Sequence, residues 1–152
     1  MQANIKIYIW APLTLKDLKQ FYKMFAQLII FLPTIVLGTM LFFSFVVAPI
    51  TFKSLNEENA RIFIRKIFPY YYNVNLTICL IATLCFVLIK NYSLNFYLIL
   101  STTILFGISS FILMPLINKF RDNKEDTKFK YSHLISVIIN FIQIVFLLLI
   151  VF

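Results

Sequence analysis

The sequence is poor in charge: only 13% of its 152 residues are Asp, Glu, Lys or Arg, while 61% are hydrophobic. A soluble domain has about 25% charged residues and about 45–50% apolar ones. This chain therefore has too little polar surface to cover a water-soluble globule, and it is too hydrophobic to be intrinsically disordered. Only two glycines are present, which excludes collagen-like and glycine-rich chains. What remains is an integral membrane protein.

Cysteine and histidine are equally scarce. Cys79 and Cys85 cannot supply the disulfide framework of a small secreted domain, and on one helix their separation of about 9 Å is beyond disulfide reach. With one histidine and six acidic residues, we expect no metal site and no cofactor. The chain lacks a Ser-His-Asp set, a phosphate-binding glycine loop and an acidic pair inside a span, so we expect no enzymatic activity and no catalytic residues.

Four stretches contain no Lys, Arg, Asp or Glu, and each is 22 to 29 residues long: 24–52, 67–89, 91–118 and 131–152. A helix needs about 20 apolar residues to cross a bilayer, so each stretch crosses once. The short alternating segments of a membrane β-barrel are missing. The sequence predicts an all-α, up-down bundle of four membrane helices near residues 15–52, 60–89, 93–119 and 126–151.

The amino-terminal 23 residues differ from the rest. Thr14 and Asp17 fit a helix N-cap box, and the residues that follow place an apolar stripe opposite three lysines. This pattern is typical of an amphipathic helix that lies in the membrane interface. We therefore divide the chain into an interfacial segment, 1–23, and a four-helix membrane domain, 24–152. The alternative is that translation begins at Met24.

The net charge of +8 comes from lysines and arginines at the ends of the hydrophobic stretches. That placement is typical of membrane proteins, so the lipid bilayer is the expected partner and nucleic acid is not. The first and third connections together contain nine Lys and Arg residues, against five on the other side. The positive-inside rule then predicts a multi-pass protein of the cell (inner) membrane with both termini outside the cytoplasm.

Polar residues inside the spans predict which helix faces are packed, because such side chains usually face a neighbouring helix or a wet cavity. In the fourth span they fall within an arc of about 80°: His133, Ser136, Asn140 and Gln143. The other spans carry shorter polar or small faces: Gln27, Thr34 and Gly38; Asn73 and Thr77; and Thr103, Gly107, Ser110, Met114 and Asn118.

These faces suggest a ligand or proton site. Histidine, with a pKa near 6.5, suits proton or ligand exchange. His133 is expected to share a polar vestibule at the cytoplasmic side with Asn73, Asn118 and Arg121, while Ser136, Asn140 and Gln143 continue inward. The alternative is that the polar faces only hold the helices together through interhelical hydrogen bonds.

Three of the prolines, Pro49, Pro69 and Pro115, lie near the ends of spans and are expected to shape the turns out of the bilayer. Pro33 lies further inside, at a position where it could kink the first span.

Several motifs together resemble the transmembrane protein 205-like family, which includes a bacterial domain of unknown function. They are the stretch from Gly38 to Pro49, Phe68-Pro69, Leu113 to Asn118 with Arg121-Asp122, and Phe129 to Asn140. The resemblance implies a four-helix membrane protein without an agreed activity. A eukaryotic relative is associated with resistance to platinum drugs, which suggests handling or export of a small solute or metal complex. This chain lacks the histidine and tryptophan that many relatives carry near Gly38.

Three functions are compatible with these features. The first is solute handling through the polar stripe, which in so small a bundle without an obvious inverted repeat would require a homo-oligomer. The second is a structural or assembly subunit of a membrane complex. The third is a haem-associated redox protein with His133 as a single axial ligand.

Overall fold

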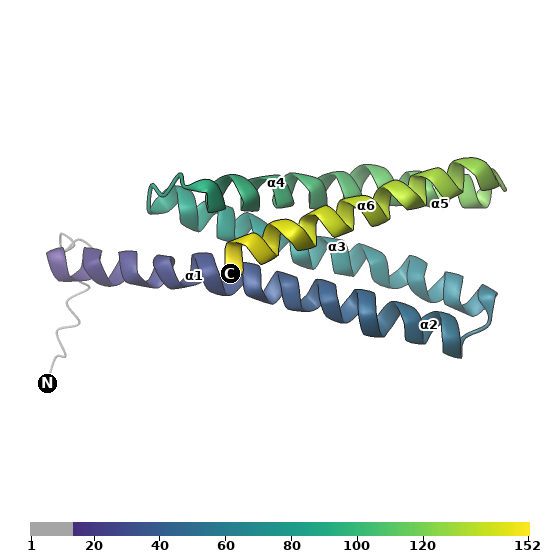
Figure 1. The fold of residues 1–152 in the computed structure, drawn as a ribbon, viewed down its shortest axis with the longest axis horizontal. Coiled ribbons are helices and arrows are strands. Elements are labelled where there is room, and N and C mark those ends of the chain that lie inside the picture. The colour runs from purple at the N-terminus through teal and green to yellow at the C-terminus, as the bar shows by residue number, and fades with distance from the viewer. Residues whose placement is uncertain (1–13) are drawn as a thin grey trace, which may run out of the picture.

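The computed structural model describes residues 14–152, which contain four helices long and apolar enough to cross a membrane (Figure 1). Two of them are built from three consecutive segments each: α1 (Leu15–Phe42), η1 (Phe43–Val47) and α2 (Ala48–Ser54), and α4 (Leu94–Ile108), η2 (Ser109–Leu113) and α5 (Met114–Asp122). The other two are α3 (Glu57–Leu88) and α6 (Asp126–Val151). The predicted all-α membrane bundle is confirmed.

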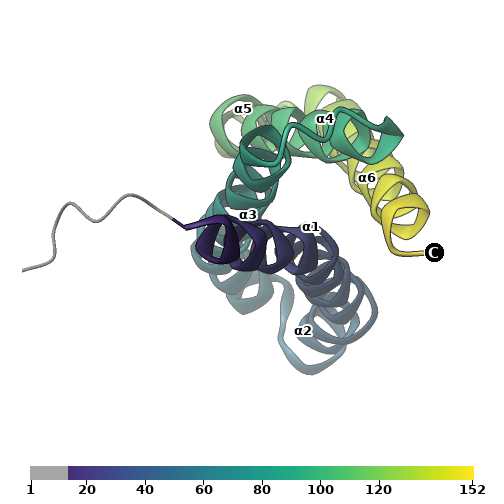
Figure 2. The same ribbon diagram turned by 90° about the vertical axis from the view of Figure 1, so that its left-hand side faces the viewer.

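The four long helices form a ring in which α1 packs on α3, α3 on α4, α4 on α6, and α6 back on α1. We call α1 to α3 the first hairpin and α4 to α6 the second hairpin. Figure 2, viewed along the bundle, shows α3 between α1 and α4. In Figure 1 α6 crosses the bundle obliquely, and α2 and α6 diverge toward the end where both hairpins turn.

Helix α1 begins at the predicted N-cap. The Thr14 side chain accepts a hydrogen bond from the Asp17 backbone N–H, and the Asp17 carboxylate accepts one from the Thr14 backbone N–H at 3.0 Å. The helix then continues without a break past Lys23 into the first span, and its first turns project beyond the end of the bundle (Figure 1). Residues 1–13 lie outside the described part of the chain, so the interfacial position of segment 1–23 stays a prediction.

Each three-part helix contains one π-helical turn followed by a proline. The N–H of Ala48 bonds the carbonyl of Phe43, and the N–H of Met114 bonds that of Ser109, five residues back in both cases. A proline inside a helix lacks an N–H and clashes with the carbonyl four residues earlier, and a widened turn relieves that clash. Pro49 and Pro115 follow these turns inside continuous helices.

The expectation that prolines shape the turns out of the bilayer is wrong for this reason: the helices extend past them. Pro69 likewise lies inside α3, twelve residues after its start at Glu57. The chain turns instead after α2 ends at Ser54, and Asn56 caps the start of α3: its side chain accepts a hydrogen bond from the Asn59 N–H at 2.9 Å.

The two hairpins carry a repeated segment. Ser44-Phe45 and Pro49 in the first hairpin correspond to Ser110-Phe111 and Pro115 in the second, 66 residues later, and both π turns keep that spacing. Burial follows the same register, because buried residues of the first hairpin have buried counterparts 66 positions on: Pro33, Val36, Leu37, Met40 and Phe43 against Ile99, Thr102, Thr103, Phe106 and Ser109. The hairpins are thus related as a parallel repeat.

The interior is apolar except for a small set of hydroxyl and amide groups. Cys79 and Cys85 are both buried and free, as expected from their spacing. Next to the polar groups, the rings of Phe43, Tyr71 and Tyr72 pack within one aromatic cluster, with the Phe43 and Tyr71 centroids 4.4 Å apart. These rings lie on η1 and α3 and bring two tyrosine hydroxyls toward α6.

Candidate polar site between the hairpins

Two residues of the predicted stripe on α6 make contacts across the bundle to α3. The hydroxyl of Tyr71 donates a hydrogen bond to Oδ1 of Asn140 at 3.3 Å, and the hydroxyls of Tyr72 and Ser136 lie 3.3 Å apart. The amide of Asn140 also donates to Oγ of Ser44, at 3.4 Å. Asn140 therefore contacts both α3 and η1, and all three contacts are longer than the usual bonds of these groups.

The deepest member of the stripe is Gln143, whose side chain is fully buried. Its amide nitrogen donates to the backbone carbonyl of Thr102 at 3.4 Å. Its carboxamide oxygen, Oε1, has no hydrogen-bond donor among the described residues. Buried polar groups are nearly always paired, whereas this oxygen is the one buried side-chain nitrogen or oxygen of the described residues without a hydrogen-bond partner.

Asn75 is a second buried amide, and sequence reasoning missed it. Its Oδ1 accepts a hydrogen bond from Thr39 at 2.6 Å, and its amide donates to the carbonyl of Tyr71 at 2.8 Å. In each hairpin, one amide of the second helix thus reaches a threonine of the first: Asn75 reaches Thr39, and Gln143 reaches Thr102. The sequence did contain a signal for Asn75. It lies four residues before Cys79 and therefore shares a helix face with this apolar residue.

The repeated serines bind asparagines of the opposite hairpin. Ser44, in the first π turn, accepts from Asn140 at 3.4 Å, and Ser110, in the second, donates to Asn73 at 2.8 Å. This reciprocal arrangement places one serine–asparagine pair on each side of the interface between the hairpins. The repeat of Ser-Phe-x-x-x-Pro is the sequence signal that would have identified Ser44.

The structure does not place His133 in the interior. Its side chain is exposed and makes no hydrogen bond within the described residues. Its ring stacks on Phe129 with centroids 5.9 Å apart. The prediction that His133 lines the bundle interior is therefore wrong, because α6 crosses its neighbours obliquely and its inward face at this level carries the buried Ser132 instead. His133 is also not positioned to bind a haem inside the bundle.

The face predicted for the first span also points outward. Gln27, Thr34 and Gly38 are all exposed, and Thr34 bonds only the carbonyl of Ile30 in its own helix. In contrast, the third-span face packs as predicted at Thr103 and Ser110, which are both buried. Thr103 lies 3.1 Å from the hydroxyl of Thr83 on α3.

The expected cytoplasmic vestibule does not form as one opening. Asn73 is exposed on α3 and lies at the depth of Ser110, which precedes Asn118 by eight residues, about 12 Å along the helix. Asn118 is half-buried. Arg121 instead pairs with Glu57 at 2.9 Å and covers the ring of Phe129 at 4.7 Å.

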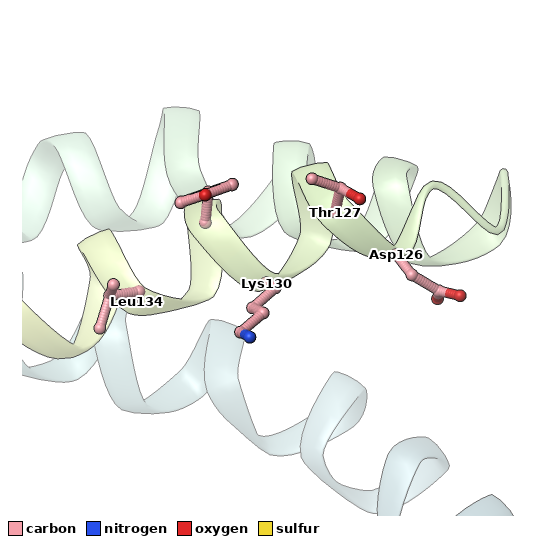
Figure 3. A pocket seen from close by; sticks show the side chains of 5 residues that line it. Asp126, Thr127, Lys130 and Leu134 are labelled. Carbon is pink, nitrogen blue, oxygen red and sulfur yellow. The ribbon is translucent and has the colours of Figure 1, made fainter.

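A depression of about 430 Å³ lies beside α6 (Figure 3). Its lining comes from α6 alone: Asp126, Thr127, Lys130, Tyr131 and Leu134. A second depression, of about 320 Å³, lies at the charged end between α3 and α5. Neither reaches Asn140, so the polar groups between the hairpins form a packed contact rather than the wall of either depression.

Among the comparisons with known proteins, the match is to a family profile. The chain matches no curated protein and no solved structure. The profile of a family described as "Domain of unknown function (DUF4149)" matches residues 31–126. The match extends from the first span to the start of α6, so Asn73, Ser110 and Arg121 lie within it and Asn140 lies beyond it. Because it covers more than half of the sequence, this multi-pass membrane chain belongs to the DUF4149 family.

Proposed function

We propose that this protein handles a small uncharged polar solute, or a neutral metal complex bearing N–H or O–H groups, between its two hairpins. The observation that carries the proposal is the buried Oε1 of Gln143, which has no donor among the described residues. Leaving a buried acceptor unpaired costs about 1–3 kcal/mol. A solute that donated a hydrogen bond to this oxygen would recover that energy.

The chemistry of the interface favours an uncharged solute. Hydroxyl and amide groups are supplied at the interface by Ser44, Tyr71 and Asn140 and, within the second hairpin, by Gln143. None of them carries a charge at neutral pH. A charged solute in this interior would need a compensating charge. Ammine or aqua ligands of a neutral metal complex offer the N–H and O–H donors that these groups accept.

We infer that such a solute would bind at the interface between the hairpins, in exchange for the polar contacts that pack there. In transporters with parallel repeats, the site lies near the bilayer midplane at the interface between the repeats. Here the contacts of Asn140 with Tyr71 and Ser44 cross that interface at 3.3 and 3.4 Å. Bonds this long are weak, so Asn140 can exchange them for a solute at little cost.

Other features are consistent with this role. The resemblance to the transmembrane protein 205-like family, with its platinum-associated relative, favours small solutes or metal complexes. We propose a non-enzymatic role in the inner membrane, with the turns of both hairpins on the cytoplasmic side and both termini outside. The first and third connections, with nine Lys and Arg residues, support this orientation.

Reconstituted vesicles provide the test. Entry of urea is measured by stopped-flow swelling, and entry of a neutral platinum diammine complex is measured as platinum content. We expect the full chain to accelerate at least one probe over protein-free vesicles, and Gln143→Leu to abolish the acceleration while the protein stays folded. Phe45→Leu, at an exposed position, is the matched control. No acceleration of either probe would overturn the proposal.

The second candidate is a structural or assembly subunit, and a specific observation favours it. The amide of Asn140 is paired across the bundle and neither depression reaches it, as expected if these groups only tie the hairpins together. In that case Gln143→Leu, which removes an unpaired polar atom, leaves stability unchanged or raises it. Gln143→Leu would then also leave the entry of urea and of the platinum complex into vesicles unchanged.

A further inference from the structure

The charged end of the bundle contains a concentration of positive charge that the proposed function does not use. The 320 Å³ depression between α3 and α5 is lined by four basic residues, one acid and one isoleucine: Arg61, Arg65, Arg121, Lys124, Asp122 and Ile62. We propose that this depression binds the phosphate of an anionic lipid headgroup.

Two ion pairs define the geometry of the site. Arg65 donates to Asp122 at 2.7 Å, and Arg121 donates to Glu57 at 2.9 Å. Both pairs join α3 to α5, so they hold the two walls of the depression together. Arg61 and Lys124 form no ion pair within the described residues, and their charges are free to bind an anion.

The backbone at Lys124 helps to position its side chain. Lys124 has a φ of 57°, a left-handed conformation, and the turn is closed by the N–H of Glu125 bonding the carbonyl of Phe120 at 2.9 Å. This is the hydrogen bond of a Schellman C-cap. Lys124 therefore lies two residues after the end of α5. It lines the same depression as Arg61, which is one helical turn before Arg65 on α3.

The position of the site favours a lipid phosphate over free phosphate. Arg65 lies two residues before the uncharged stretch of the second span, and Arg121 lies three residues after that of the third. This level corresponds to the headgroup layer, and basic pockets between membrane helices on the cytoplasmic side bind anionic headgroups. Ile62, 46% exposed, supplies an apolar contact at the rim where an acyl chain would begin.

The test is lipid retention by the detergent-solubilised full chain, counted by native mass spectrometry after incubation with phosphatidylglycerol or phosphatidylcholine. We expect phosphatidylglycerol to be retained at least about tenfold more than phosphatidylcholine. The double substitution Arg61→Gln with Lys124→Gln should remove that preference. It leaves both ion pairs intact, and an unchanged thermal midpoint will show that it folds.

Matched controls are Lys90→Gln, at the opposite end of the bundle, and Lys130→Gln, beside the other depression. Both should retain the preference. Equal retention of the two lipids, or an undiminished preference in the double variant, would overturn the proposal. Millimolar inorganic phosphate provides another arm: if it displaces phosphatidylglycerol completely, the site is one for free phosphate and the lipid assignment is wrong.

Discussion

The two hairpins have the same framework but differ at the equivalent serine. In the second hairpin Ser110 makes a short bond, 2.8 Å, to Asn73, which has no other cross-helix hydrogen bond. In the first hairpin Ser44 accepts a 3.4 Å bond from Asn140, which it shares with Tyr71. The repeated segment therefore forms a short interhelical hydrogen bond at Ser110 in the second hairpin. At Ser44 in the first hairpin it forms a weak contact that Asn140 shares with Tyr71.

The difference shows that the same local motif, a π turn followed by a proline, can support a short hydrogen bond in one hairpin and a long one in the other. The π turn and the following proline fix the direction of each serine, because they set the helix register on both sides of it. The strength of the bond depends on the partner helix, since α3 packs against η2, whereas α6 does not pack closely along η1 and crosses the bundle obliquely (Figure 1). Changes at equivalent positions can test whether this interpretation holds.

The largest expected effect comes from substitutions at buried positions that are equivalent in the two hairpins. Met40 and Phe106 occupy equivalent positions and are both fully buried. We expect Met40→Ala to lower the free energy of unfolding by about 2–5 kcal/mol and Phe106→Ala by about 3–5 kcal/mol, measured by denaturant titration in detergent micelles. Phe45→Ala and Phe111→Ala, at side chains 74% and 71% exposed, should stay within about 0.5 kcal/mol. Equal losses at all four positions would disprove the shared register.

Substitutions at the two serines test whether the Ser110 bond is stronger than the Ser44 bond. We expect Ser110→Ala to lower the free energy of unfolding by about 1 kcal/mol, within the range measured for membrane-embedded bonds. Ser44→Ala should lower it by less than about 0.5 kcal/mol, because a 3.4 Å contact is weak. The same titration measures both. If Ser44→Ala lowers the free energy of unfolding as much as Ser110→Ala does, the two serine–asparagine bonds are equally strong and the proposed difference between the hairpins is wrong.

The turns differ between the hairpins as well. Lys124, in the turn of the second hairpin, is left-handed with a φ of 57°, whereas Leu55, in that of the first, is extended with a φ of −111°. A left-handed L-residue costs about 1–2 kcal/mol, and glycine recovers part of it against its own entropy. We expect Lys124→Gly to raise the thermal midpoint slightly and Leu55→Gly to lower it. A gain from both would show that the turns do not differ.

The smallest effect is a pH dependence confined to the second hairpin. Hydrogen bonds from the side chains of Lys128 and Asn123 lower the pKa of Glu125 below its ordinary value of 4.5. The folded state therefore holds this proton more weakly than the unfolded state, so the stabilisation is present above pH 4.5 and is lost as the pH falls through the lowered pKa. The Glu125 side chain is partly exposed, at 31%, and its ion pair with Lys128 is screened by solvent, so the change in thermal midpoint will be small. Glu125→Gln should flatten this part of the profile, and an unchanged slope would contradict the assignment.

Most of the fold could be predicted from the sequence because the relevant signals are local. The lengths of the uncharged stretches set the number of spans, and the predicted bounds agree with the helices within a few residues. The Thr14–Asp17 cap was predicted from two residues three positions apart. Such signals need no knowledge of neighbouring helices.

The candidate site was predicted only in part. Angular position on a single helix correctly grouped Ser136, Asn140 and Gln143, which all contact other helices. It also grouped His133 with them, although His133 is exposed. Angular position alone cannot exclude His133, because the direction of the interior changes along a helix that crosses its neighbours.

The sequence by itself determined that this protein crosses the membrane four times and where the crossings begin and end, because hydrophobic length and helix capping depend on neighbouring residues in the chain. Only the tertiary structure decided which polar groups meet. The pairing of Asn75 with Thr39, and of Asn140 with Ser44, depends on helix crossing and on π turns that shift the register. Those are properties of helices packed against one another, and no single helix specifies them.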